Sequence, residues 1–184
     1  AKAGAVSISQ TGTTLTSGAS AHGIVAQSIS SQGAGGNIAI TYEGSITASG
    51  MDADGIRAQS QGVAASATDF TSPFPLLSGT TVPNNGDIAI TINGKGIVAG
   101  GAGDGAAIRF IDGRNNTLVN YGTLTTSKGL DGITVIGGSG NEVFDNYGTL
   151  EGRINLGGGV NAFRNHAGAT IVPCAVLELG GASA

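Results

Sequence analysis

A ten-residue motif that occurs twice, and a third time in a looser form, constrains the fold more than any other feature of this sequence. The first copy spans residues 115–124 (NNTLVNYGTL), and the second spans residues 141–150 (NEVFDNYGTL), 26 positions later. The third copy begins at Asn161 (NAFRNHAG). Repeats with a period of about 20 to 50 residues are typical of solenoid proteins, in which each repeat is one supersecondary unit stacked on the next.

The first half of the chain carries a second repeat, with an offset of 32 positions between its two copies. The copies are residues 6–28 and 38–60, which share an alternating start (VSIS, IAIT) and a common end (HGIVAQS, DGIRAQS). A third copy begins at Ile88, 50 positions after the second. Residues 63–86 match no repeat and explain the longer spacing. We therefore predict a single domain over residues 1–184, with a loop insertion at residues 63–86.

The alternation of apolar and polar residues inside the repeats predicts short β-strands, and Gly, Asn, Asp and Ser bound these segments. No stretch has the apolar spacing of an amphipathic helix. A β-sandwich would also contain short strands, but only a solenoid requires equivalent strands to carry equivalent residues. We therefore predict an all-β fold, a right-handed parallel β-helix of about six or seven irregular coils, with the hand that parallel crossovers favour.

Two rows of equivalent residues recur in the three motif copies: the apolar Leu118, Phe144 and Phe163 and, two positions later, Asn120, Asn146 and Asn165. We predict that the apolar row lies inside the solenoid. We predict that the asparagines form a ladder at a coil corner, because Asn tolerates left-handed backbone and its amide can bond to the amide above. His166 replaces Tyr121 and Tyr147 in the motif, which predicts a stacking role for its ring.

Composition and charge argue against several functional classes. Charged residues make up only 11% of the chain and the net charge is −4, so the basic footprint of a nucleic-acid-binding protein is absent. There is no Lys/Arg-rich amphipathic stretch and no long apolar run, so we predict no direct insertion into a membrane. One cysteine, Cys174, excludes an internal disulfide framework. The 34 glycines are interpreted as turn residues.

Two sequence patterns bear on calcium. Residues 137–144 (GGSGNEVF) are similar to a calcium-binding repeat, but the pattern occurs once and has Glu142 in place of Asp. Three aspartates precede glycine at related positions of the repeats and would form a column of carboxylates for a hard cation: Asp54, Asp104 and Asp131. However, His22 takes that position in the first repeat, and Asp before Gly commonly begins a tight turn. We interpret both patterns as turns and predict no metal and no cofactor.

Residues that could catalyse a reaction are not clustered. A glycosidase-type site needs two carboxylates on one face, whereas the 12 acidic residues are scattered, mostly beside glycine. Arg57 and Arg109 occupy related repeat positions, but no cluster of carboxylates accompanies them. The histidines are limited to His22 and His166. We therefore predict that the protein is not an enzyme, and a carbohydrate-active enzyme on the same scaffold is the least favoured alternative.

The insertion at residues 63–86 is the candidate ligand-contact loop. It carries four large apolar side chains: Phe70, Phe74, Leu76 and Leu77. Long loops on a repeat scaffold often carry binding residues, and three prolines in the segment argue against a regular strand. The equally weighted alternative is that the apolar residues fold back and cover the side of the solenoid.

The segments HGIVAQS and DGIRAQS and the paired NYGTL motifs resemble passenger domains of Gram-negative autotransporters, over nearly the whole chain apart from residues 63–86. Such passengers are extracellular β-helices, often adhesins, made with an N-terminal signal and a C-terminal outer-membrane barrel. The resemblance implies a fragment of an adhesin-like passenger at the bacterial cell surface. We expect a non-enzymatic protein that binds a protein or glycan through its faces or its loop. The alternative is a self-associating extracellular matrix or filament component.

Overall fold

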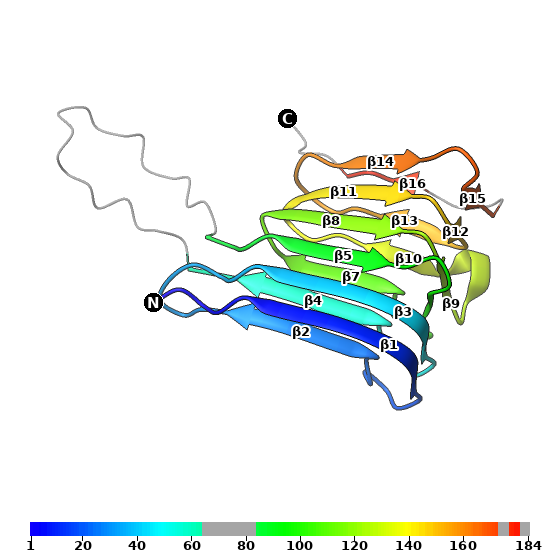
Figure 1. Cartoon of the computed structure of the whole chain (residues 1–184), viewed down its shortest axis with the longest axis horizontal. Coiled ribbons are helices and arrows are strands. Elements are labelled where there is room, and N and C mark those ends of the chain that lie inside the picture. The colour runs from blue at the N-terminus through cyan, green and yellow to red at the C-terminus, as the bar shows by residue number, and fades with distance from the viewer. Residues whose placement is uncertain (64–83, 173–176, 181–184) are drawn as a thin grey trace.

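The computed structural model describes residues 1–63, 84–172 and 177–180, and over these ranges the chain is built almost entirely from strands. The only helix in these ranges is the three-residue 3-10 turn η1 (Gly129–Asp131). In the same part of the chain there is no helix with the length and apolarity that a bilayer requires. The strands form two sheets, and all of their pairings are parallel (Figure 1). The predicted all-β, parallel class is therefore confirmed.

The larger sheet contains ten strands: β1 (Val6–Thr16), β3 (Ile38–Ala48), β5 (Ile88–Ile92), β6 (Ile97–Gly100), β8 (Asn115–Asn120), β9 (Thr123–Thr126), β11 (Asn141–Asn146), β12 (Thr149–Leu150), β14 (Ala162–Asn165) and β15 (Thr170–Ile171). The strand order is β14-β11-β8-β5-β3-β6-β9-β12-β15, and β1 pairs with β3. The first half of β3 pairs with β5 and its second half with β6. Because β3 belongs to both limbs, the sheet bends around an axis and nearly closes.

The second sheet contains six strands: β2 (Ile24–Ile29), β4 (Ile56–Gln61), β7 (Ile108–Asp112), β10 (Ile133–Ile136), β13 (Arg153–Asn155) and β16 (Leu177–Glu178). Their order, β2-β4-β7-β10-β13-β16, follows the chain. The strands lie one above another from the N-terminal end to the C-terminal end of the molecule (Figure 1). The arrangement is consistent with a parallel β-solenoid, in which the chain visits both sheets on each circuit.

Equivalent residues of successive repeats face one another across the strands, and their inward side chains form the core. One row runs in register through six strands: Ile8, Ile40, Ile90, Leu118, Phe144 and Phe163. Leu118 and Phe144 are each 1% exposed, whereas Phe163 is only partly buried near the C-terminal end of the stack. The structure thus places all three residues of the predicted apolar row in one column facing the interior.

Candidate functional site

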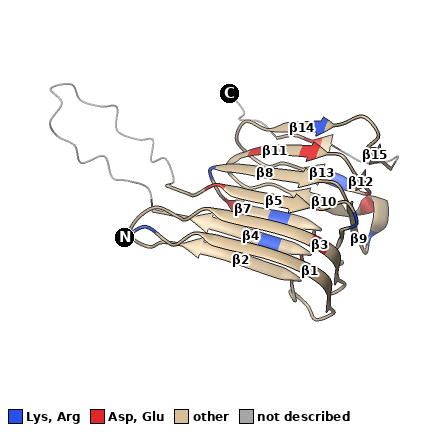
Figure 2. Ribbon diagram, in the orientation of Figure 1, with Lys and Arg blue, Asp and Glu red and all other residues tan. Residues whose placement is uncertain are grey.

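Charged residues are sparse on the strands (Figure 2), and at two places they are register partners on neighbouring strands. The first is the outer side of the second sheet, where Arg57 of β4 and Arg109 of β7 are register partners. The second is the larger sheet, where Asp145 of β11 pairs with Arg164 of β14. These two places are the candidates for a functional site.

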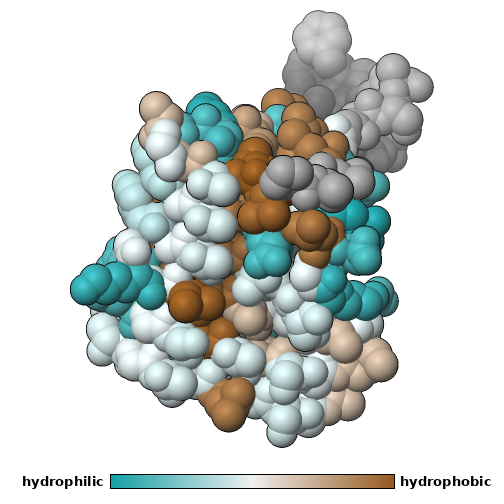
Figure 3. All heavy atoms as spheres, turned by 90° about the vertical axis from the view of Figure 1, so that its right-hand side faces the viewer, coloured by the Kyte–Doolittle hydropathy of each residue, from teal (hydrophilic) through white to brown (hydrophobic). Residues whose placement is uncertain are grey.

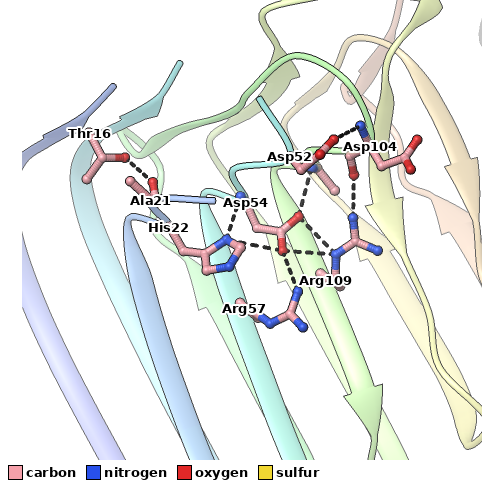
Figure 4. Close-up of polar contacts among 9 residues, drawn as sticks. Thr16, Ala21, His22, Asp52, Asp54, Arg57, Asp104 and Arg109 are labelled. Carbon is pink, nitrogen blue, oxygen red and sulfur yellow. Dashed lines mark hydrogen bonds and ion pairs between the residues drawn. The ribbon is translucent and has the colours of Figure 1, made fainter. Parts of the chain in front are cut away.

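Asp54, in the segment that leads into β4, is the centre of the first cluster (Figure 4). Its side chain is fully buried. Nε of Arg109 lies 2.9 Å from each carboxylate oxygen, and Nη1 of Arg57 lies 3.2 Å from Oδ2. The backbone N–H of Ala106 donates to Oδ1 at 3.0 Å. Two guanidinium groups therefore offset the charge of one buried carboxylate, which links two neighbouring turns of the chain.

His22 adds a third turn of the chain to this cluster. The backbone N–H of Asp54 donates to Nδ1 of His22 at 2.8 Å, so the ring proton belongs on Nε2. Burial is the largest influence on the pKa of His22 and lowers it below 6.5; the Asp54 carboxylate opposes this shift, and Arg57 and Arg109 add to it. His22 is therefore neutral at pH 7 and acts as a hydrogen-bond acceptor.

Acidification should remove stability that His22 contributes. In the unfolded chain the imidazole binds a proton near its ordinary pKa of 6.5, whereas the folded protein binds it only at lower pH, so protons favour the unfolded state. The contribution is complete above about pH 6.5 and is lost as the pH falls toward the folded pKa. Urea unfolding at two pH values measures it, and His22→Gln should depend less on pH than the wild type. An identical pH dependence of the two proteins would disprove this role of His22.

The Asp54 cluster is better suited to holding turns together than to catalysis. Asp54 accepts hydrogen bonds from two arginines and a backbone amide, so neither carboxylate oxygen is left to act on a ligand. Arg109 also donates to the backbone carbonyl of Asp104, and Oδ1 of Asp52 accepts from the backbone N–H of Asp104 at 2.8 Å. These contacts join adjacent turns at the start of the strands.

Asp54, Asp104 and Asp131 do not form the carboxylate column that was the alternative to the turn interpretation. Ile56 pairs with Ile108, so β4 and β7 align residues 52 positions apart. In the larger sheet the offset is 50 positions between β3 and β5 and 52 positions between β3 and β6, so two residues are added between β5 and β6. At the offset of 52, Asp104 lies beside Asp52, and Ala106 lies beside Asp54. Asp104 and Asp131 are both exposed, unlike Asp54. Within the described ranges, no three His, Cys, Asp or Glu side chains come together in a group that could hold a metal ion.

The second candidate is a column of three stacked rings, which follow β8, β11 and β14 at one corner of the solenoid. The ring centroids of Tyr121 and Tyr147 lie 4.9 Å apart with an interplanar angle of 17°. Those of Tyr147 and His166 lie 3.9 Å apart with an angle of 9°. Tyr121 is 47% exposed and Tyr147 is 42% exposed. We call Tyr121, Tyr147 and His166 the ring column.

Asp145 connects the ring column with charged side chains. Its Oδ1 lies 2.7 Å from Nε2 of His166, and its Oδ2 lies 3.3 Å from Nη1 of Arg164. Both partners belong to the next repeat, so these contacts hold the third ring against the second. The corner therefore presents partly exposed ring edges beside a carboxylate and a guanidinium group.

The predicted asparagine ladder lies one residue before the ring column. Nδ2 of Asn120 donates to Oδ1 of Asn146 at 2.8 Å, and Nδ2 of Asn146 donates to Oδ1 of Asn165 at 2.8 Å. Asn120 and Asn146 are fully buried. Oδ1 of Asn120 also accepts from the backbone N–H of Gly122 at 3.0 Å. The ladder therefore fixes the turns on which the rings stand.

The residues predicted for ligand contact in the insertion lie outside the described part of the chain: Phe70, Phe74, Leu76 and Leu77. Cys174 lies outside it as well. The described flanks of the insertion are close together, because the backbone N–H of Gly62 donates to Oδ1 of Asn85 at 2.9 Å. The ligand-contact role of the insertion stays a prediction.

Comparison of the chain with models of known protein families, with curated proteins and with solved structures found no match in any of the three. The autotransporter resemblance therefore stays a prediction carried by the repeated motifs.

Proposed function

We propose that this chain is a right-handed parallel β-helix of about six or seven coils that serves as an adhesive or structural protein outside the cell or at its surface. It binds a protein or glycan ligand and catalyses no reaction. The single observation that carries this proposal is the ring column Tyr121, Tyr147 and His166, which is partly exposed and adjoins the asparagine ladder. The motif resemblance further supports a passenger domain of an autotransporter as the setting.

The physical argument for the ring column is preorganisation. Tyrosine offers a rigid apolar body with a polar tip, a combination that is enriched in binding surfaces. Each ring stacks on a neighbouring ring, and the asparagines one residue before the rings are hydrogen bonded to one another. Ligand binding therefore sacrifices little side-chain entropy. The column lies at the ends of β8, β11 and β14 (Figure 1). Figure 3 turns this side of the molecule toward the viewer. Weakly polar residues predominate on it, and hydrophobic residues form a band among them.

A carbohydrate-active enzyme is less well supported. Glycoside hydrolysis needs one carboxyl group as an acid and a second as a base or nucleophile, about 5 to 10 Å away. Asp54 is buried between two arginines, and Asp145 is paired with Arg164 and His166. The carboxylates of both charge clusters are thus paired with arginine or histidine side chains. This pairing favours binding over acid–base chemistry.

Removing the rings tests the proposal. Biolayer interferometry would measure binding of the wild type and of Tyr121→Ala/Tyr147→Ala to immobilised glycans and extracellular glycoproteins. For any ligand that the wild type binds, we expect affinity to fall about tenfold or more, because two aromatic anchors are lost. Thr41→Ala/Thr91→Ala is the matched control, since these register partners lie on the outer face of β3 and β5. Unchanged affinity of the ring variant would contradict the proposed surface.

The insertion is a second proposed contact, and its deletion distinguishes it from the ring column. Residues 64–83 can be replaced by a Gly-Ser dipeptide, because the flanks Gly62 and Asn85 are hydrogen bonded to each other. If the loop carries the ligand, the deletion variant should lose binding while the ring variant keeps it. The reverse result assigns binding to the rings.

Self-association is the alternative function, and an observation on the N-terminal strands favours it. Among the described strands, β1 pairs only with β3 and β2 pairs only with β4, so each leaves one edge open. Leu15 on β1 is 72% exposed. Open strand edges can pair with another chain. Light scattering over a concentration series, with and without calcium, separates the two functions: constant monomer mass favours ligand binding, and growth in mass favours assembly.

A further inference from the structure

A second column of side chains at the start of the strands changes from apolar to polar along the solenoid. Ile38, Ile88, Asn116 and Glu142 follow one another in register on β3, β5, β8 and β11. Asn116 and Glu142 are each 1% exposed, like the isoleucines that they follow. A carboxyl group therefore lies in the interior of the protein, at a position that earlier repeats fill with a hydrocarbon.

The hydrogen bonds of this pair leave two oxygens without a donor. Oε1 of Glu142 accepts from Nδ2 of Asn116 and from the backbone N–H of Gly138, each at 2.9 Å. Oε2 of Glu142 and Oδ1 of Asn116 are buried and have no hydrogen-bond partner. An unpartnered buried acceptor costs about 1 to 3 kcal/mol. Here two such acceptors lie on side chains that are hydrogen bonded to each other. This arrangement indicates that Glu142 and Asn116 lack a proton or a cation.

The charged groups on the neighbouring elements interact with partners other than Glu142. Asp87, before β5, pairs with Arg114, before β8. Asp112 gives its backbone carbonyl to Nδ2 of Asn116, while its carboxylate accepts from Gln59. None of the ion pairs in the described part of the chain includes Glu142. An ionised Glu142 would thus be a buried charge without a counter-ion, which is strongly disfavoured.

The repeat that follows β11 also contributes no charge to the pair. Oδ1 of Asn161 accepts from the backbone N–H of Glu142 at 2.8 Å. Nδ2 of Asn161, which carries two hydrogens, lies within hydrogen-bond distance of four backbone carbonyls, including that of Leu156 at 3.1 Å. Asn161 is thus fully engaged with backbone groups and has no donor left for Oε2 of Glu142.

We propose that Glu142 and Asn116 form a buried proton-binding site, in which Glu142 is a neutral carboxylic acid and its Oε2–H donates to Oδ1 of Asn116. One proton taken from solvent supplies the donor that both unpartnered oxygens lack. Nδ2 of Asn116 already donates to Oε1, so the acid and the amide join through two hydrogen bonds. The site makes the packing of β8 against β11 responsive to pH.

The environment of Glu142 agrees with this assignment. Burial raises the pKa of Glu142 above its ordinary value of 4.5, against the opposing hydrogen bonds from Gly138 and Asn116. A raised folded pKa means that the folded state binds the proton more tightly than the unfolded chain does. Stability is therefore greatest below the unfolded pKa and declines as the pH rises through the folded pKa. This direction is opposite to that expected for His22.

The test compares the wild type with Glu142→Gln in thermal unfolding from about pH 5 to about pH 9. The glutamine amide keeps an acceptor for Asn116 and supplies the donor permanently. We expect the Tm of the wild type to fall by about 5 °C relative to E142Q as the pH rises across this range. Glu43→Gln, on the exposed side of β3, is the control and should follow the wild type.

Infrared spectroscopy of the wild-type protein provides a second readout that requires no variant to fold. At pH 7 we expect a carbonyl band of a protonated carboxylic acid, which disappears when the pH is raised. Absence of that band, or the same dependence of Tm on pH in wild type and E142Q, would overturn the proposal. A rise in Tm on adding sodium or calcium chloride, in the wild type but not in E142Q, would assign the unpartnered oxygens to a cation and overturn it as well.

Discussion

Replacing Asp54 with alanine should lower the free energy of unfolding by about 3 kcal/mol, because it leaves two arginines without their buried counter-ion. Arg109 is the more affected, since its side chain is 19% exposed against 33% for Arg57. The backbone N–H of Ala106 also loses its acceptor. Urea unfolding followed by circular dichroism at pH 7.5 measures the change.

The matched control is Asp87→Ala, which removes an aspartate that pairs with an arginine at the surface. The side chains of Arg114 and Asp87 are 59% and 37% exposed. An exposed ion pair of this kind is screened by solvent and contributes little to stability, so this substitution should destabilise the protein much less than Asp54→Ala. If the two substitutions destabilised the protein equally, Asp54 would not be the central link between adjacent turns.

The Phe144→Ala substitution should cost about 4 kcal/mol of unfolding free energy, because it opens a cavity within the apolar row at a fully buried position. Phe144 is 1% exposed and pairs in register with Leu118 on one side and Phe163 on the other. Its ring centroid lies 5.0 Å from that of Phe163. Urea unfolding at constant pH measures the loss.

Phe163→Ala is the control for this prediction, since it removes the same chemical group at a less buried position. Phe163 is only partly buried against the core. Its loss should therefore cost less than half as much as that of Phe144. Equal costs would mean that Phe144 is not buried more deeply than Phe163.

The rows along the solenoid could be predicted because the repeats preserve both residue type and spacing. Asn120 and Asn146 are 26 positions apart in the sequence, and β8 and β11 pair at that spacing. Leu118 and Phe144 share the spacing. An equal offset between identical motifs leaves one natural register for parallel strands, so the column follows directly.

The Asp54 cluster could not be predicted, because its members come from turns whose lengths differ. The related positions of Arg57 and Arg109 were evident, but aligning Asp54 with Asp104 by their shared Asp-Gly dipeptide placed the wrong residue beside Asp54. The offset changes from 50 positions between β3 and β5 to 52 positions between β3 and β6, and it stays 52 between β4 and β7. Turn residues do not repeat, so only the strand register shows that Ala106 is the true neighbour.

The proton site of Glu142 was hidden for a different reason. The glycine-rich pattern around residues 137–144 favoured a turn, and the turn hydrogen bond from Gly138 is present. The sequence pattern does not indicate whether the side chain of Glu142 is buried. The interior position of Glu142 follows from its register with Asn116 and from the register of Asn116 with Ile88. The first pair is 26 positions apart and the second is 28 positions apart, so a constant repeat length does not align the three residues.

The rows, the ring column and both clusters depend on one claim, that successive repeats stack in register as parallel strands. Gln27 of β2 and Gln59 of β4 are register partners on the outer face, and their side chains are hydrogen bonded at 2.9 Å. Cysteines at both positions, in a Cys174→Ser background, should lie within disulfide distance. Gln61, two residues along β4, provides the off-register partner, because its Cα would be about 8 Å from that of residue 27.

The measurement is the fraction of each double variant that forms an intramolecular disulfide in air, scored by mass spectrometry and free-thiol titration. The account predicts nearly complete oxidation of Gln27→Cys/Gln59→Cys and little oxidation of Gln27→Cys/Gln61→Cys. Equal oxidation of the two pairs, or preferential oxidation of the off-register pair, would contradict the parallel in-register stack.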